Sequence, residues 1–151
     1  MLSQSCKYGI WAILYLASDP DREYISIREI SSKLKISFHF LTKILQSLTQ
    51  AKVIVSMRGA SGGVALARSA KDINLREIIE AVDGNHIFTE CILGLPGCGN
   101  EKPCPMHEKW AVKRSEFTQM CEATTLDALA TDAETSRWLN SEVLPGINMH
   151  S

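Results

Sequence analysis

Three of the five cysteines of this chain, followed by a histidine, lie in one short stretch, residues 91–107. The stretch reads CILGLPGCGNEKPCPMH, so the cysteines have the spacing C-x6-C-x5-C and the last is followed by a histidine at C-x2-H. Prolines and glycines interrupt it, which predicts a loop rather than a helix or strand. A loop that gathers thiolates and an imidazole can hold an iron–sulfur cluster or a zinc ion.

The residues alone leave the chemistry of this loop open. The four candidate ligands are Cys91, Cys98, Cys104 and His107. They could bind an iron–sulfur cluster, or they could hold a structural zinc ion. The cysteines could also work without metal, as a reversible thiol/disulfide switch. A loop without chemistry is the remaining alternative. Cys121 lies on the apolar face of an expected helix and is predicted to be buried.

A cysteine beside a histidine can also form a nucleophilic pair, which raises the question of an enzyme. Cys104 and His107, however, lie in a proline-rich loop, and the sequence offers neither an orienting acid nor an oxyanion-hole motif. It also lacks a P-loop, a dinucleotide fingerprint and a zinc-protease motif. We therefore expect that the protein is not an enzyme.

The charge of the chain is divided between its two halves. Residues 1–75 contain ten Lys/Arg and five Asp/Glu, whereas residues 76–151 contain six and twelve. A basic half suggests a polyanionic partner, although a chance asymmetry of solvated charges is the alternative. No apolar run approaches the roughly 20 residues that cross a bilayer, and no signal peptide is evident. We therefore expect no membrane association and a cytoplasmic location with reduced cysteines.

Helical periodicity and capping signals predict the elements that precede the loop. A wide apolar face predicts a helix from Ser3 to Ser18, and a capping box at Ser26 starts a short second helix, residues 27–34. Ser37 caps a third helix that runs to about Ala51, with the apolar face Phe40, Leu41, Ile44, Leu45 and Leu48. Two helices joined so closely fit a helix-turn-helix, which presents the start of its second helix to DNA bases.

A hairpin is predicted directly after the third helix, with strands at residues 53–57 and 64–67 and a glycine-rich turn between them. A hairpin in this place is the wing of a winged helix-turn-helix. An arginine on it, such as Arg58 or Arg68, suits the minor groove and its phosphates. A plain surface hairpin is the alternative. Asn74 is expected to cap a fourth helix that ends at Asp83.

A further helix is expected after the loop, from about Glu108 to Ala123. Its large apolar residues, Trp110 and Phe117 among them, suggest packing against a second copy of the chain; folding back on its own domain is the alternative. Two short helical segments follow, residues 125–130 and 132–142. The predicted fold class is mainly α with a small β-hairpin wing. The expected regions are the DNA-binding domain (1–84), the sensor loop (85–107) and the dimerisation helix with C-terminal helices (108–151).

Several short motifs, in this order along nearly the whole chain, resemble the Rrf-two family of bacterial winged helix-turn-helix transcription regulators, in particular its IscR-like and NsrR-like members. They are Lys7-Tyr8, Ile27-Arg-Glu-Ile30, Ile36-Ser-Phe-His-Phe-Leu41, the sequence VSMRGASGG at residues 55–63, Ala67-Arg68 and Ile79-Glu-Ala-Val-Asp-Gly84. The three loop cysteines follow where the family keeps its cluster ligands.

The resemblance implies a homodimeric regulator that binds a two-fold symmetric operator in double-stranded DNA and senses redox state, nitric oxide or iron–sulfur status. It implies an iron–sulfur cluster held by Cys91, Cys98 and Cys104, with His107 as the fourth ligand. A 2Fe–2S cluster is favoured and a 4Fe–4S cluster is possible. The implied DNA contacts are Lys7, Tyr8, Arg28, Ser37, Phe38, His39, Lys43, Arg58, Ser61 and Gly62. A metal-free thiol switch and a zinc-stabilised DNA-binding protein stay as alternatives.

The sequence departs from the family pattern in ways that limit what carries over. The first cysteine interval has six residues where five is usual. Phe40 replaces a usual tyrosine, and Thr42-Lys43 replaces Glu-Gln, so the operator sequence cannot be inferred. Some relatives use an acidic cluster ligand near the first helix, where this chain has Cys6-Lys7-Tyr8. That difference favours His107 as fourth ligand and leaves Cys6 as an outside candidate.

Overall fold

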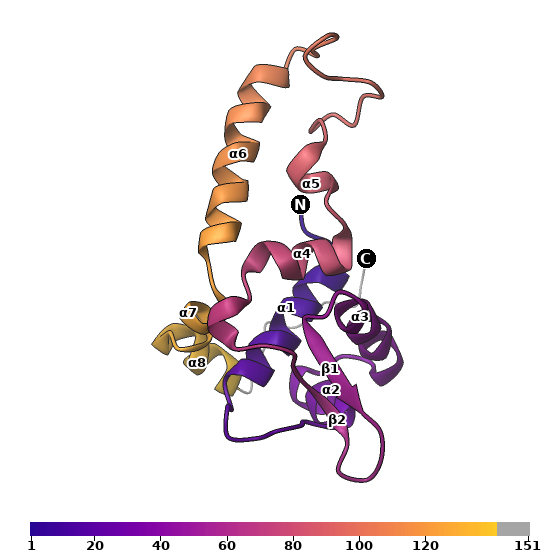
Figure 1. Ribbon diagram of the computed structural model, residues 1–151, viewed down its shortest axis with the longest axis vertical. Helices are drawn as coiled ribbons and strands as arrows, with labels where there is room; N and C mark the ends of the chain where they lie inside the picture. Colours follow the sequence, from indigo (N-terminus) through magenta and orange to yellow (C-terminus); the bar gives the residue numbers. More distant parts are fainter. Residues whose placement is uncertain (142–151) are drawn as a thin grey trace.

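The computed structural model describes residues 1–141, which form one chain of helices with a small hairpin (Figure 1). The elements are α1 (Gln4–Ala17), α2 (Ile27–Leu34), α3 (Phe38–Gln50), β1 (Ile54–Met57), β2 (Gly63–Leu66), the 3₁₀ helix η1 (Ala70–Asp72), α4 (Leu75–Asp83), α5 (His86–Thr89), α6 (His107–Ala123), α7 (Leu126–Ala130) and α8 (Ala133–Asn140). The predicted fold class is confirmed. The predicted end of the last segment, at residue 142, lies outside the described residues.

Side-chain caps start the helices of the helix-turn-helix and α4 at the predicted residues. The hydroxyl oxygen of Ser26 accepts a hydrogen bond from the Glu29 N–H at 3.2 Å, and α2 follows. Ser37 caps α3 in the same way. Asn74 and Glu77 bond each other's backbone N–H groups reciprocally, both at 3.0 Å. These caps satisfy donors that have no partner inside a helix, and they act within a few residues of sequence.

The wing is tied to the helical core by a third piece of extended chain. β1 and β2 pair antiparallel, with Ile54 opposite Leu66 and Met57 opposite Gly63. Ile25 forms a bridge to Val64 on the other side of β2, with N–O distances of 3.0 and 2.9 Å. The segment between α1 and α2 therefore holds the start of β2, next to the wing turn.

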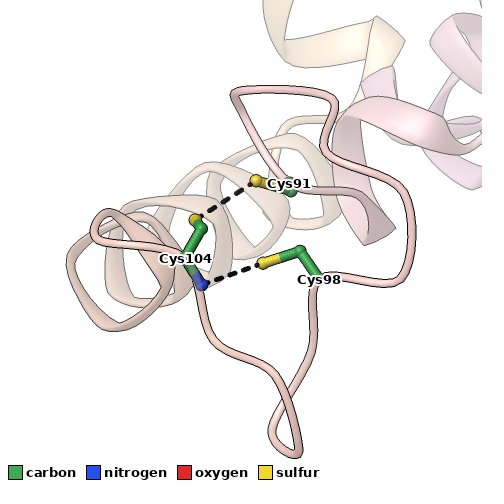
Figure 2. A group of neighbouring side chains, drawn as sticks. All are labelled: Cys91, Cys98 and Cys104. Carbon is green, nitrogen blue, oxygen red and sulfur yellow. Dashed lines mark hydrogen bonds between the residues drawn. The ribbon is translucent and has the colours of Figure 1, made fainter.

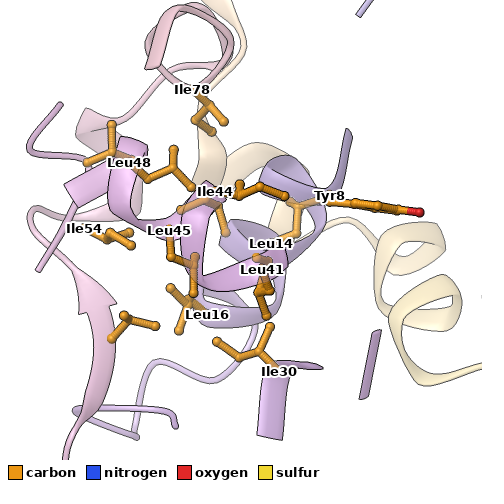
Figure 3. Packing of buried hydrophobic residues seen from close by; sticks show 14 of the residues in the cluster. Tyr8, Leu14, Leu16, Ile30, Leu41, Ile44, Leu45, Leu48, Ile54 and Ile78 are labelled. Carbon is orange, nitrogen blue, oxygen red and sulfur yellow. The ribbon is translucent and has the colours of Figure 1, made fainter. Parts of the chain in front are cut away.

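The core lies between α1, α2, α3, α4 and the base of the wing (Figure 3). Ile13, Ile30 and Leu41 are fully buried there. Leu126 of α7 and Leu139 of α8 belong to the same cluster. The C-terminal helices therefore return to the DNA-binding region, and the two regions share one core.

Phe40 does not belong to the buried face of α3, contrary to the sequence prediction. Its side chain is 38% exposed. In the first turn of α3 it lies beside α1, where its ring meets the ring of Tyr8 edge-on with centroids 5.8 Å apart. Helical periodicity placed Phe40 near the apolar face, but the neighbouring helix covers only one edge of its ring.

The long helix α6 rises away from the core, and its C-terminal half packs against its own chain (Figure 1). Phe117 stacks on Phe88 of α5 with ring centroids 5.7 Å apart, and Cys121 is buried as predicted. One face of the Phe117 ring is thus covered by α5, a helix that the sequence did not predict. The packing of α6 against a second copy stays a prediction. The exposed large apolar residues of α6 are Val112 and Met120, at 58% and 54%. None of the helices within residues 1–141 has the length and apolarity to span a membrane.

Candidate functional site

The three loop cysteines converge at the end of the molecule that is farthest from the wing (Figures 1 and 2). Their Sγ atoms all lie within 4.8 Å of one another. The Sγ atoms of Cys91 and Cys104 are 3.5 Å apart, and the Cys104 N–H donates to Cys98 Sγ at 3.4 Å. The segment is a loop, as predicted, and α6 begins at its last residue. Residues separated by up to 13 positions are therefore gathered into one thiol triad, Cys91, Cys98 and Cys104.

His107 lies beside the thiol triad in an orientation suited to a ligand. Its Nδ1 is 3.6 Å from Cys98 Sγ, and its Nε2 is 3.1 Å from Asn100 Oδ1. The Asn100 oxygen can only accept, so His107 Nε2 donates to it, while Nδ1 faces the thiol triad. In metal-binding histidines, the ring nitrogen that does not bind the metal commonly donates such a hydrogen bond, which fixes the orientation of the ring. Asn100 is a positioning residue that the sequence had not singled out.

The thiol triad can supply a thiolate at neutral pH. Partial burial opposes ionisation of Cys91, but hydrogen bonds from the Leu93 N–H and the Cys104 thiol outweigh it and lower the Cys91 pKa to about 7. Burial and the adjacent Cys91 raise the pKa of Cys104. The pair therefore loses its first proton from Cys91. Thiolates are the form that binds iron or zinc and the form that attacks oxidants.

Two residues of α6 attach the loop to the helix. The indole N–H of Trp110 donates to the Glu90 carbonyl oxygen at 2.9 Å. The Arg114 guanidinium donates to the carbonyl oxygens of Thr89 and Glu90 at 3.2 and 3.0 Å. The backbone just before Cys91 is thus fixed to α6 through Trp110 and Arg114. The sequence feature that could have predicted this attachment is the spacing of His107, Trp110 and Arg114, which puts all three on one helical face.

Three of the candidate ligands and the residues that support them line a small pocket. It has a volume of about 200 Å³ and is lined by Cys91, Cys98, Asn100, His107, Trp110 and Arg114, with Thr89 and Gly99. The donor set fits an iron–sulfur centre, because the loop brings three thiols and one imidazole nitrogen close together. The same thiols would also fit one tetrahedral zinc ion, whose sulfur ligands lie about 3.8 Å apart.

Cys6, the outside candidate, is not part of this site. It is fully buried between α1, α4 and α6, in an apolar cluster with Cys121, Ile79 and Phe88. Burial and the nearby Asp83 carboxylate raise its pKa to about 12. A protonated thiol enclosed in apolar side chains is a packing residue.

Alkylation should separate the two classes of cysteine. We expect iodoacetamide at pH 7 to modify Cys91 first in the reduced, metal-free protein, since its pKa of about 7 leaves much of it as thiolate. Cys6 should stay unmodified until denaturant is added, because its pKa of about 12 and its burial keep it protonated and covered. Peptide mass spectrometry checks the order of labelling. Equal labelling rates for Cys6 and Cys91 would contradict this assignment.

The predicted DNA contacts lie mostly on one exposed region of the helix-turn-helix and wing. The exposed residues among them are Lys7, Arg28, Ser37, Phe38, His39, Lys43, Arg58 and Ser61. Gly62 is partly buried, and its N–H donates to the Gly59 carbonyl oxygen at 3.0 Å, closing the wing turn. A Cβ at Gly62 would lie 2.2 Å from the Met57 carbonyl oxygen, so this turn requires glycine there.

Two residues have structural partners that the sequence did not reveal. The Tyr8 side chain is only 5% exposed, with its ring against Trp11 and Phe40, so its main role is packing. Arg68 forms an ion pair with Glu77 of α4. It therefore holds the end of the hairpin to α4, and Arg58 remains the arginine of the wing turn.

Comparison with known proteins gives the family of the chain. Residues 2–132 match the Rrf2 family, the Rrf-two family of the resemblance above, which is described as an iron-dependent transcriptional regulator. The chain is 30% identical over 131 residues to a putative HTH-type transcriptional regulator of Aquifex aeolicus, covering 85% of this chain and 90% of the relative. It is 26% identical to NsrR of Oceanobacillus iheyensis (88% and 91% covered) and 29% identical to IscR of Pectobacterium carotovorum (88% and 80% covered).

A solved structure agrees with this relationship. CymR, the global cysteine regulator of B. subtilis, superposes with a TM-score of 0.71 at 26% identity, covering 86% of this chain and 95% of CymR. The relatives are named as transcriptional regulators, which confirms the prediction that the protein is not an enzyme. The chain therefore belongs to the Rrf2 family and is a transcription regulator with a winged helix-turn-helix fold.

Proposed function

We propose that this regulator senses redox, nitric oxide or iron–sulfur status through an iron–sulfur cluster held by Cys91, Cys98, Cys104 and His107. The observation that carries the proposal is the thiol triad, whose Sγ atoms lie within 4.8 Å of one another, with His107 Nδ1 beside Cys98. When bound, such a cluster supplies reversible one-electron chemistry and a site of attack for oxidants and nitric oxide. A 2Fe–2S cluster is favoured, because His107 follows Cys104 at the C-x2-H spacing that this chain shares with the IscR-like members.

The loop can influence the DNA-binding region through α5, α6 and α4. Trp110 and Arg114 attach the backbone before Cys91 to α6. Arg76 of α4 forms ion pairs with Glu80 and with Glu122 of α6, and its guanidinium lies 5.0 Å from the Phe88 ring centroid. In turn, α4 packs on α1 and α3. A change in the ligand state of the loop would thus shift α5 and α6 against α4, and through α4 the recognition helix α3.

The DNA-binding surface in this proposal consists of the start of α3, Arg28 of α2, Lys7 of α1 and the wing turn. The protein would act in the cytoplasm as a homodimer on a two-fold symmetric operator, with the wing turn near the minor groove. The exposed residues Val112 and Met120 on α6 mark the helical face that would meet the second copy. Dimers of this kind place two recognition helices about one turn of DNA apart.

The proposal is tested on protein purified without oxygen. We expect visible absorbance between roughly 300 and 500 nm, with iron and sulfide in matching amounts. The operator would then be selected from random duplex DNA, and its affinity measured for cluster-loaded and cluster-free protein. Stoichiometric zinc in a colourless protein would contradict the sensor, and equal operator affinity of both forms would contradict the coupling through α4.

A second candidate function, a metal-free thiol switch, is favoured by one contact. Cys91 and Cys104 lie 3.5 Å apart between sulfurs, and the Cys91 pKa is lowered to about 7. CymR is named a global cysteine regulator, which suggests that this fold also serves regulators of sulfur metabolism. An oxidant would take two electrons and two protons from the two thiols, leaving a Cys91–Cys104 disulfide.

The thiol switch has its own expected result. Diamide treatment of metal-free protein should lower the mass by about 2 Da and join the Cys91 and Cys104 peptides. Cys98→Ser should preserve this disulfide, because Cys98 is not a member of the pair, whereas Cys91→Ser should prevent it. A disulfide that forms mainly through Cys98 would overturn the assignment of the pair.

A further inference from the structure

We propose that Phe38 is a positioning residue that holds the Arg28 guanidinium in place. Arg28 and Arg58 would then bind the phosphates of one DNA strand together. The inference rests on the proposed DNA-binding surface and deepens it. It concerns the groove between α3 and the wing, which has a volume of about 550 Å³. The groove is lined by Arg28, Phe38, Thr42, Gln46, Ser56 and Arg58, among others.

Arg28 and Phe38 form a contact between the two helices of the helix-turn-helix. The guanidinium carbon of Arg28 lies 4.9 Å from the centroid of the Phe38 ring, within the range of a cation–π interaction. Phe38 is 42% exposed, so its ring is not part of the core. An exposed aromatic ring at the start of a recognition helix is explained by its use as a platform for the arginine.

The charges of the two groove arginines are not neutralised by carboxylates of the described chain. Within residues 1–141, neither Arg28 nor Arg58 forms an ion pair, whereas Arg68 and Arg76 both do. The carboxylate next to Arg28 in sequence, Glu29, is already bound by Arg22 and Tyr15. Two unneutralised guanidinium groups lining one groove favour an anionic occupant.

A DNA strand is the occupant that this groove fits. The groove lies beside the start of α3, so a duplex read by α3 brings a phosphate strand to the wing. Guanidinium groups bind phosphate oxygens with two parallel hydrogen bonds, and the hydroxyl group of Ser56 adds a further donor. A guanidinium already held over a ring loses less conformational freedom when it binds. Phe38, which the family resemblance had suggested as a DNA contact, would therefore increase affinity through Arg28 without touching DNA.

A phosphate clamp does not depend on sequence, so a mixed-sequence duplex of about 30 base pairs is a suitable probe. The full-length protein would be titrated by fluorescence anisotropy at several salt concentrations. Arg28→Gln should weaken binding and flatten the salt dependence by about 0.9 in log–log slope for each lost phosphate contact. Phe38→Leu should weaken binding about five-fold, because it removes the ring face but keeps an apolar side chain. Phe38→Tyr should bind like wild type.

The double variant decides between positioning and direct contact. If Phe38 acts through Arg28, then Phe38→Leu has no further effect in the Arg28→Gln background. If the two substitutions reduce DNA affinity additively, Phe38 contacts DNA itself and the inference is wrong. An unchanged salt dependence in Arg28→Gln would also overturn the inference. Lys102→Gln is the matched control, since it removes one charge from the cysteine loop, at the other end of the molecule (Figure 1). Wild-type protein that binds no duplex at all would refute the DNA-binding surface itself, and this inference would fall with it.

Discussion

Replacing Cys104 with serine is expected to abolish iron–sulfur loading, so that visible absorbance after anaerobic reconstitution falls below about a tenth of the wild-type value. Cys104 is the central thiol of the triad, because its sulfur lies 3.5 Å from Cys91 Sγ and its N–H donates to Cys98 Sγ at 3.4 Å. A serine hydroxyl stays protonated at neutral pH and is a hard ligand, so it does not replace a thiolate on iron. The difference in operator affinity between reconstituted and untreated protein should disappear with the absorbance.

The matched control is Cys121→Ala. Cys121 is buried in the cluster with Cys6 and Phe88, outside the thiol triad. This variant should therefore keep the full visible spectrum, at the cost of a modest loss in thermal stability. Full absorbance in Cys104→Ser, or its loss in Cys121→Ala, would show that the cluster is not held by the loop. His107→Ala should reduce loading less than Cys104→Ser, because three thiolates remain.

Replacing Gly63 with alanine is expected to destabilise the fold by roughly 3 kcal/mol or more. The new Cβ would lie 2.2 Å from the Ile25 carbonyl oxygen and 2.8 Å from the Ser26 nitrogen, and Gly63 has φ +152. Both neighbours are backbone atoms in the bridge that holds the wing, so they cannot rotate away. For a domain of this size the melting temperature should fall by about 10 °C, measured by circular dichroism.

Two other glycines separate steric overlap from backbone strain. Gly59 has φ +111 but open space around its Cβ position, so Gly59→Ala should cost only about 1 kcal/mol. Gly99 has open space and no positive φ, so Gly99→Ala should leave the melting temperature unchanged. If Gly63→Ala and Gly59→Ala lowered the melting temperature equally, the bridge from Ile25 to β2 would not constrain the wing. The wing position should also affect DNA binding, which Gly63→Ala should weaken more than Gly59→Ala.

The sequence by itself determined the elements that depend on neighbouring residues. Ser26, Ser37 and Asn74 start their helices where the capping pattern predicted, because each cap bonds an N–H group only three residues away. The loop of residues 91–106 was equally readable, since proline and glycine act on the local backbone. The candidate ligands were also evident, because their residue types and spacing are properties of one short segment.

Only the tertiary structure decided which surfaces meet. Periodicity identified an apolar face on α6, but not that Phe88 of the unpredicted α5 would cover Phe117. It also could not reveal that the Arg68 side chain pairs with Glu77, or that Cys6 is enclosed far from the other candidate ligands. The same is true of the Arg28 and Phe38 contact across the helix-turn-helix. Such contacts depend on how separate elements pack, and a residue's type and local spacing do not specify which partner the folded chain brings to it.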